Sequence, residues 1–332
     1  MVDVQLLERD LSGIVCIITG GHSGLGRSTT FQLLKQGATV VVGCRNIEDD
    51  RCSSLRLATE KLTGTIHFEV LDLSCCNSVR NFVHTFEQNY NDGLHILINN
   101  AGIMGVTPRC LSTDGFELQF QTNYLSHFLL THLLIDRLKQ SSTSEYTSRV
   151  INISSSNAVQ DGLTGAHGFV DLDDINFNAR EYTGMAGYGQ SKLCQILHAK
   201  ELATQHDSTE LLAVSVHPGS ALSNITRNLF PYAIRVLISP SERCLTGQIS
   251  DWAAIQTGLH CILSDGLTAH RSDWAVIESG EFYSQHDSPL GTRGGWPLYD
   301  YIECAQAADS DIASKLYRRS LLWAQSTAKV PG

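Results

Sequence analysis

Short apolar runs alternate with longer helix-compatible stretches over about the first 220 residues of the chain. The runs at residues 15–19, 38–43, 66–71, 95–99, 149–154 and 212–216 have the length and apolar character of strands. The stretches at residues 27–36, 46–62, 79–88, 123–139 and 188–206 are compatible with helices. Nearly continuous apolar strands that alternate with helices predict a parallel sheet covered on both faces.

The pattern loosens beyond residue 222, and it shows no internal repeat and no linker. We therefore expect one α/β domain rather than two. Phe282 and Tyr283, which follow Gly280, are the candidates for a last edge strand. Residues 300–325 are expected to form a C-terminal helical extension.

Composition and charge exclude several classes of protein. The chain has 332 residues, of which 42% are hydrophobic and 17% charged, as in ordinary globular proteins. The formal net charge of -10 argues against a nucleic-acid partner, because no basic stripe offsets it. No run of about 18 apolar residues occurs, so we expect no membrane span.

The ten cysteines form no C-x-x-C motif, and no histidine lies at zinc-ligand spacing from a cysteine pair. We therefore expect no metal site and reduced thiols. The N-terminal residues 1–13 lack an apolar signal-peptide core. Together these features favour an intracellular, cytoplasmic protein.

A glycine-rich turn joins the first strand to the first helix. Its candidates for cofactor binding are Gly20, Ser23, Gly24, Leu25 and Gly26. Glycines let the backbone approach a pyrophosphate, whose charge is stabilised by the free N–H groups of a helix start. Because the spacing departs from G-x-G-x-x-G, the turn alone leaves two interpretations open, a dinucleotide loop and a turn without a ligand.

Arg45 stands just after the second strand, about 20 residues beyond the glycines. A site specific for NAD would carry a carboxylate here to bind the ribose 2′-hydroxyl. Cys44 and Arg45 offer no acid and one cation, which favours the 2′-phosphate of NADP(H), with Arg27 as a second contributor. An arginine on a solvated turn is the alternative.

Two other strand ends carry candidates for coenzyme contact. They are Asp72 and Leu73 after the third strand, and Asn100, Ala101 and Gly102 after the fourth. Ligands of open parallel sheets bind beyond the carboxyl ends of the strands, where these residues fall. Each segment also reads as an ordinary turn, so neither is specific by itself.

Tyr188 and Lys192 are spaced to share one face of a helix, and Ser155 follows the fifth strand. A free phenol has a pKa near 10 and is a poor base at neutral pH. We expect the Lys192 ammonium to lower the pKa of Tyr188 by stabilising the phenolate. A surface helix is the alternative interpretation of Y-x-x-x-K in isolation.

Taken in order, these motifs resemble the short-chain dehydrogenase/reductase family, and within it the retinol dehydrogenases and the catalytic domain of WW-domain-containing oxidoreductase. The motifs occupy residues 19–26, 43–46, 99–102, 120–128, 149–155, 188–194 and 216–219. The resemblance covers about residues 12–285. It implies a Rossmann-like, doubly wound sheet of about seven strands in a single domain over residues 1–332.

The resemblance also implies a catalytic tetrad of Asn123, Ser155, Tyr188 and Lys192. Tyr188 would exchange a proton with the substrate oxygen that Ser155 orients, while Lys192 binds the nicotinamide ribose. Asn123 would hold a water that links Lys192 to solvent. Ser154 competes with Ser155, but the second serine takes the catalytic place in the family pattern. The cofactor-binding set then also includes Tyr188, Lys192, Pro218 and Gly219.

Residues 222–241 correspond to the substrate lid of the family, and their apolar run favours a lipophilic substrate such as a retinoid or a steroid. The same run leaves open a helix packed on the domain body and a peripheral membrane contact. The helices at residues 123–139 and 188–206 would offer a dimer face, so homodimer and monomer both remain open.

We therefore expect an NADP(H)-dependent enzyme that interconverts a carbonyl and an alcohol. The alternative is a catalytically weak NADP(H)-binding regulatory protein of the same fold. An epimerase or dehydratase of the extended family is disfavoured by the spacing in residues 19–26 and by residues 99–102.

Overall fold

Seven parallel strands form one sheet in the computed structural model, which describes residues 4–159, 168–218, 225, 254–264, 282–284 and 305–326. The strand order is β3-β2-β1-β4-β5-β6-β7. Its members are β1 (Val15–Thr19), β2 (Thr39–Cys44), β3 (Thr65–Val70), β4 (Ile96–Asn99), β5 (Arg149–Ile153), β6 (Leu212–His217) and β7 (Phe282–Ser284). The order reverses between β1 and β4, which confirms the Rossmann-like, doubly wound domain.

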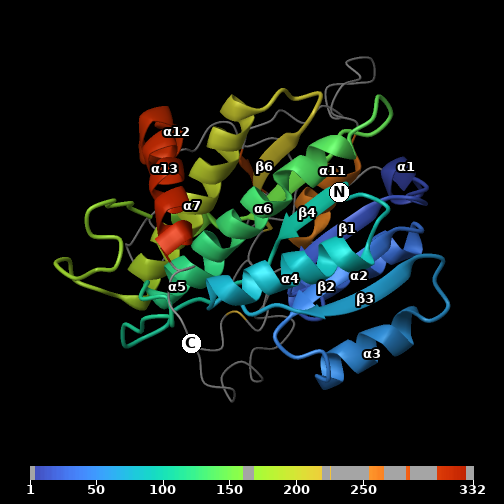
Figure 1. Ribbon diagram of the computed structural model, residues 1–332, viewed down its shortest axis with the longest axis horizontal. Helices are drawn as coiled ribbons and strands as arrows, with labels where there is room; N and C mark the ends of the chain where they lie inside the picture. The colour runs from blue at the N-terminus through green and yellow to red at the C-terminus, as the bar shows by residue number, and fades with distance from the viewer. Residues whose placement is uncertain are drawn as a thin grey trace, which may run out of the picture.

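The sheet is buried because successive strand residues face opposite layers of helices (Figure 1). Cys16 and Ile18 of β1 pack in one core with α2 (Gly24–Lys35), α3 (Asp50–Thr59) and α11 (Gln256–Leu263). Ile17 of the same strand packs in a second core with α4 (Cys76–Asn89), α6 (Ser126–Gln140) and α7 (Gly184–Gln205). Nearly continuous apolar strands were therefore the correct signature of a sheet covered on both faces.

The strand predictions are confirmed to within one or two residues, including the last edge strand at Phe282 and Tyr283. Helix boundaries differ more. The helix expected at residues 46–62 is α3, which starts at Asp50 because the side chain of Asp49 accepts a hydrogen bond from the Arg51 N–H. The helix expected from Tyr188 begins at Gly184, where Thr183 caps it by accepting from Ala186 N–H.

The helix expected at residues 123–139 begins as a π-helix, η1 (Gln121–Leu125), before α6. A π-turn carries i→i+5 hydrogen bonds and often marks a functional site. The remaining short elements are α1 (Val4–Leu7), α5 (Leu118–Phe120), η2 (Ser156–Ala158) and α12 (Ala305–Ala308).

A C-terminal helix, α13 (Ser310–Ser326), lies against α7 and α6 (Figure 1). Leu316 and Ala313 of α13 join a third apolar core with Leu193 and Leu197 of α7 and Phe128 of α6. The residues expected as a substrate lid, 222–241, lie outside the described residues except for Ile225.

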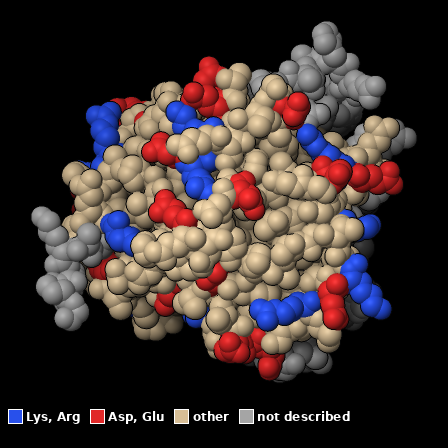
Figure 2. Space-filling model, turned by 45° about the vertical axis from the view of Figure 1, so that its right-hand side comes forward, with Lys and Arg blue, Asp and Glu red and all other residues tan. Residues whose placement is uncertain are grey.

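Acidic and basic side chains are interspersed over the face of the molecule seen in Figure 2. Within the described residues, none of the helices combines the length and the apolar character that crossing a bilayer requires. The cysteines that the structure describes are free thiols.

Candidate functional site

A cleft of about 930 Å³ opens at the carboxyl ends of the strands, where the strand order reverses. Several strand ends and the start of α2 contribute its walls. The predicted residues that line the cleft are Gly20, Ser23, Gly24, Leu25, Gly26, Arg45, Asp72, Leu73, Asn100, Ala101, Gly102, Ser155, Tyr188, Lys192 and Pro218. Gly219 lies outside the described residues, and the lining does not include Asn123.

The glycine-rich loop forms a close-fitting turn at the N-terminus of α2. Gly20 has a φ of +66°, a region that favours glycine. A Cβ on Gly26 would lie 2.6 Å from Asn100 Nδ2 and 2.7 Å from the Gly20 carbonyl oxygen. The first-turn N–H groups of α2 have no partners within the helix and carry the positive end of its dipole, so this turn suits an anion.

Thr19, at the end of β1, holds the loop after β4 in place. Its Oγ1 accepts hydrogen bonds from the N–H groups of Asn100 (3.0 Å) and Ala101 (2.9 Å). The Asn100 amide in turn donates to the Thr19 carbonyl at 2.8 Å. These bonds join the glycine loop to residues 100–102, which were individually weak candidates in the sequence.

Arg45 is exposed at the other end of the cleft, and two charged neighbours that sequence reasoning missed lie beside it. The Arg51 guanidinium donates to both carboxylate oxygens of Asp49, at 2.7 and 2.6 Å. These bonds hold the pKa of Asp49 below its ordinary value. Residues 45–51 of the cleft wall therefore contribute two cations and one acid, and that acid is already paired. Arg27, expected as a second contributor, does not line it.

Tyr188, Ser155 and Lys192 converge in the middle of the cleft. Tyr188 is 4% exposed, and burial raises the pKa of its phenol to about 12, opposed by a hydrogen bond with Ser155. Ser154, the competing serine, donates its hydroxyl to the Lys192 carbonyl at 2.7 Å. Of the two serines, Ser155 is thus the one beside the phenol.

Burial, rather than the Lys192 ammonium, sets the direction in which the pKa of Tyr188 is shifted. The Lys192 Nζ donates to the Ile153 carbonyl at 2.6 Å and lies 5.7 Å from the centroid of the Tyr188 ring. Burial lowers the pKa of the Lys192 ammonium to about 7. We expected the ammonium to lower the pKa of Tyr188, whereas the pKa of the phenol is raised, because burial disfavours the charged forms of both groups.

Asn123 is fully buried in η1, behind the wall of the cleft. Its Oδ1 accepts from Ile103 N–H at 2.8 Å, and its Nδ2 donates to the Ile103 carbonyl and to Ser191 Oγ, both at 2.9 Å. Its main-chain carbonyl accepts from Gln195 and from His127. Asn123 therefore ties the loop after β4 to α7. The water-holding role that the resemblance implies stays a prediction.

The residues of the cleft fit a nicotinamide dinucleotide. A Cβ on Gly26 would collide with Asn100 and with the Gly20 carbonyl, so a glycine is needed for the loop to close at the start of α2, where a pyrophosphate would bind. The buried Nδ1 of His217 has no hydrogen-bond partner among the described residues, and His217 lines the cleft. This buried polar atom is available to a polar group of a ligand bound in the cleft.

Sequence reasoning missed other residues of the cleft, among them His22, Ile103, Val106 and Leu118. His22 stands within the glycine loop, and its position was the only signal that could have placed it here. Nothing in the sequence marks Val106, which lies in an irregular segment after β4, or Leu118, which begins the three-residue helix α5.

Comparison with known proteins gives one consistent result. A family model described as short chain dehydrogenase matches residues 14–167. Retinol dehydrogenase 12 of mouse is 37% identical over 258 residues, which cover 77% of this chain and 75% of that protein. The WW domain-containing oxidoreductase of chicken is 37% identical over 233 residues, or 70% of this chain and 55% of that protein.

A solved structure shares the fold at lower identity. The NADPH-bound carbonyl reductase from chicken fatty liver matches with a TM-score of 0.58 at 19% identity, over 83% of this chain and 96% of that one. This likeness shows the fold, and the match to retinol dehydrogenase 12 confirms the family resemblance that the ordered motifs indicated.

Proposed function

Because the chain belongs to the short-chain dehydrogenase/reductase family, a family of carbonyl and alcohol oxidoreductases, we propose that it is an NADP(H)-dependent enzyme acting on a lipophilic small molecule. One observation carries the proposal. Ser155, Tyr188 and Lys192 converge in the same cleft as the glycine loop, so a dinucleotide bound on the loop would reach the three side chains.

Each of the three side chains has a separate task in this reaction. The coenzyme supplies or accepts the hydride when it is bound. Ser155 orients the substrate oxygen, and Tyr188 moves the proton to or from that oxygen. With a pKa of about 12 the Tyr188 phenol is protonated at neutral pH, which suits it to donate a proton to a carbonyl. Lys192 lies beside Tyr188 and would bind the nicotinamide ribose.

The preference for NADP(H) is supported by the charges at the far end of the cleft. Among the acidic residues that line the cleft, Asp49 is closest to Arg45 in the sequence. Both of its carboxylate oxygens already accept hydrogen bonds from Arg51. A 2′-phosphate there would meet the guanidinium of Arg45, which has no ion pair with any residue that the structure describes, and would form charge-assisted hydrogen bonds with it. The NADPH that accompanies the chicken carbonyl reductase agrees with this assignment.

A lipophilic substrate is supported by apolar side chains in the wall of the cleft. Ile103, Val106 and Leu118 line it and are partly exposed. Burial of apolar surface against such side chains favours apolar ligands. The name of the mouse relative points to a retinoid, and a steroid would present a similar surface.

The proposal is tested by measuring NADPH oxidation on retinals, ketosteroids, quinones and aliphatic aldehydes, with NADH in parallel. We expect turnover of at least one lipophilic carbonyl, faster with NADPH than with NADH. Tight NADPH binding without turnover on any substrate would instead support the regulatory protein that keeps the fold and binds coenzyme.

Tyr188→Phe is the first variant to test. It removes the proton donor while preserving the buried ring, so we expect turnover to fall at least about 100-fold, a typical contribution of general acid–base catalysis. The Kd for NADPH, measured by fluorescence titration, should change little. Retained turnover would remove Tyr188 from the role of proton donor.

A further inference from the structure

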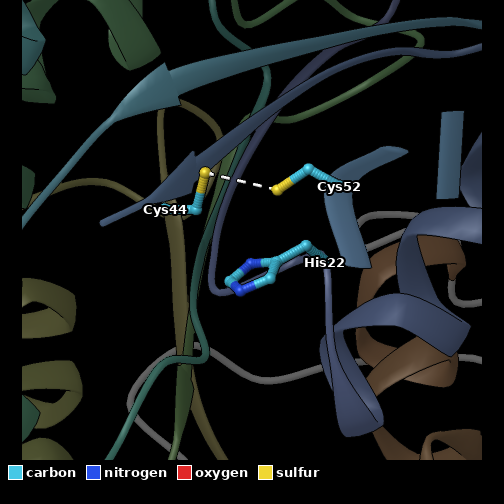
Figure 3. A group of neighbouring side chains, drawn as sticks. All are labelled: His22, Cys44 and Cys52. Atoms are coloured by element: carbon cyan, nitrogen blue, oxygen red, sulfur yellow. Dashed lines mark hydrogen bonds between the residues drawn. The ribbon is translucent and has the colours of Figure 1, made fainter. Parts of the chain in front are cut away.

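Three side chains of metal-ligand type meet beside the glycine loop (Figure 3). His22 belongs to that loop, Cys44 ends β2, and Cys52 lies in the first turn of α3. Their ligand atoms all lie within 4.8 Å of one another. Both cysteines are buried, with 3% and 1% of their surfaces exposed. The three residues come from separate segments, and the fold brings them together.

The spacing of the three groups matches part of a tetrahedral coordination sphere. The two sulfur atoms are 3.7 Å apart. Two Zn–S bonds of about 2.3 Å that meet at the tetrahedral angle place their sulfurs roughly 3.8 Å apart. The Nδ1 of His22 is buried and has no hydrogen-bond partner among the described residues. Coordination would satisfy a ring nitrogen whose unpaired burial costs free energy.

We propose that His22, Cys44 and Cys52 bind one soft metal ion, with Zn²⁺ as the representative of that class. Two thiolates and an imidazole are ligands that Zn²⁺ prefers, and water from solvent would complete the four-coordinate site. On binding, each thiol releases its proton to solvent, and each sulfur donates an electron pair to the metal. The complex of Zn²⁺ with two thiolates then carries no net charge.

The thiols need little rearrangement to bind the ion. Both S–H groups approach the Asn46 carbonyl, at 3.6 Å from Cys44 and 3.7 Å from Cys52, so the protein holds them with weak bonds only. A disulfide between the same two residues is the competing outcome. It would require the sulfurs to close to about 2.05 Å and an oxidant to accept two electrons, whereas metal binding requires neither.

The site adjoins the coenzyme cleft, because His22 and Cys44 line that cleft as well. The sequence did not reveal this metal site, because Cys44 follows His22 by 22 residues and Cys52 follows Cys44 by 8 residues. These separations match no known zinc-binding spacing. The register that pairs Thr19 with Gly43 brings the glycine loop beside the end of β2. Metal binding does not depend on the proposed catalysis, because it is measured without coenzyme or substrate.

The experiment uses the full-length, reduced and metal-stripped protein. Co²⁺ is titrated as a spectroscopic probe, and Zn²⁺ affinity is measured by competition with a chromophoric chelator. We expect one metal per chain, a thiolate-to-cobalt charge-transfer band and the visible bands of tetrahedral Co²⁺. Cys44→Ser or Cys52→Ser should weaken Zn²⁺ binding at least about 100-fold, beyond the 10- to 100-fold that loss of an outer-shell partner costs. His22→Gln should weaken it about 10-fold or more.

Cys110→Ser is the matched control, because Cys110 is an exposed thiol outside the cluster. The Zn²⁺ affinity of this variant should equal that of the wild-type protein. Zinc-edge X-ray absorption on the wild-type protein should show two sulfur ligands, which keeps the test valid if a serine variant fails to fold. Equal Zn²⁺ affinity in a folded Cys52→Ser variant or a sulfur count other than two would overturn the site. So would a Cys44–Cys52 disulfide that persists while the protein is kept under a thiol reductant.

Discussion

The burial of the Lys192 ammonium in the candidate site lowers the stability of the folded protein. Lys192 is 2% exposed, and burial lowers the pKa of its ammonium from 10.5 to about 7. Between pH 7 and 10.5 the unfolded chain therefore binds more protons than the folded chain, so the stability rises with pH across that window. Below pH 7 the full cost applies, at most about 5 kcal/mol for a shift of this size.

Replacing Lys192 with methionine removes this cost and keeps most of the apolar stem. We expect Lys192→Met to abolish turnover and to raise the melting temperature by several degrees at pH 7, with a smaller gain at pH 9.5. The measurement is thermal unfolding at both pH values. Lys200→Met on the same helix is the control, since Lys200 is partly exposed, and it should show no such dependence. An equal gain for Lys192→Met at both pH values would contradict the argument.

Arg45 bears on the choice of coenzyme. Arg45→Asp removes a cation that would meet the 2′-phosphate and adds repulsion, so we expect the preference for NADPH over NADH to fall by roughly 100-fold. The ratio of kcat/KM for the two coenzymes measures this. Arg318→Asp makes the same change of charge at an exposed position of α13 and should leave the ratio unchanged. An unaltered ratio in Arg45→Asp would remove Arg45 from coenzyme recognition.

At the scale of an element, α13 covers α7 and α6 and closes the third apolar core. The Tyr124 hydroxyl shares a buried hydrogen bond with Ser320 Oγ of α13 at 2.8 Å. We expected the helices at residues 123–139 and 188–206 to offer a dimer face. The helix α13 packs on part of that face, and the homodimer and the monomer both stay predictions.

Two leucines of α13, one buried and one exposed, allow the contribution of packing to stability to be distinguished from that of helix propensity. Leu316 is 1% exposed in the core, and Leu322 is 65% exposed. We expect Leu316→Ala to lower the free energy of unfolding by about 2–5 kcal/mol, through lost burial and the cavity left behind. Leu322→Ala should change it by less than about 0.5 kcal/mol. Urea denaturation of both variants checks this, and similar losses would mean that α13 does not pack as described.

For the whole molecule, Arg149 joins the sheet to α11. It starts β5, is 1% exposed, and one of its guanidinium nitrogens donates to the carbonyls of Cys261, Ile262 and Ser264 at 2.8–3.0 Å. Its guanidinium also lies 4.4 Å from the centroid of the Tyr146 ring. A cation at the C-terminal end of a helix is stabilised by the helix dipole, and here it also satisfies carbonyls that the helix leaves unpaired.

Arg149→Met should therefore destabilise the protein by about 2–4 kcal/mol, since the buried carbonyls lose a charged donor. Arg149→Lys should recover only part of the loss, because an ammonium does not reproduce the planar guanidinium. Arg109→Met, at an exposed position, is the control. Unfolding midpoints in urea measure all three, and a neutral Arg149→Met would show that α11 does not depend on this connection.

The strands, the main helices and about half of the residues that line the cleft could be predicted from the sequence alone. Strand positions follow from short apolar runs, and the pairing of Tyr188 with Lys192 follows from helical spacing, because both depend only on neighbouring residues. Because the strands are parallel, their carboxyl ends lie at the same edge of the sheet. The glycine loop, Arg45 and residues 100–102 could therefore be assigned to one cleft.

The surroundings of each functional side chain could be known only from the tertiary structure. It turned Asn123 toward Ile103 and Ser191, paired Asp49 with Arg51, and brought His22 to Cys44 and Cys52. Burial set the pKa of Tyr188 and of Lys192 in directions that the i, i+4 spacing does not reveal. The physical reason is common to these cases. Desolvation and ligand geometry depend on strand register and on the packing of distant segments, and a local pattern of residues carries no record of either.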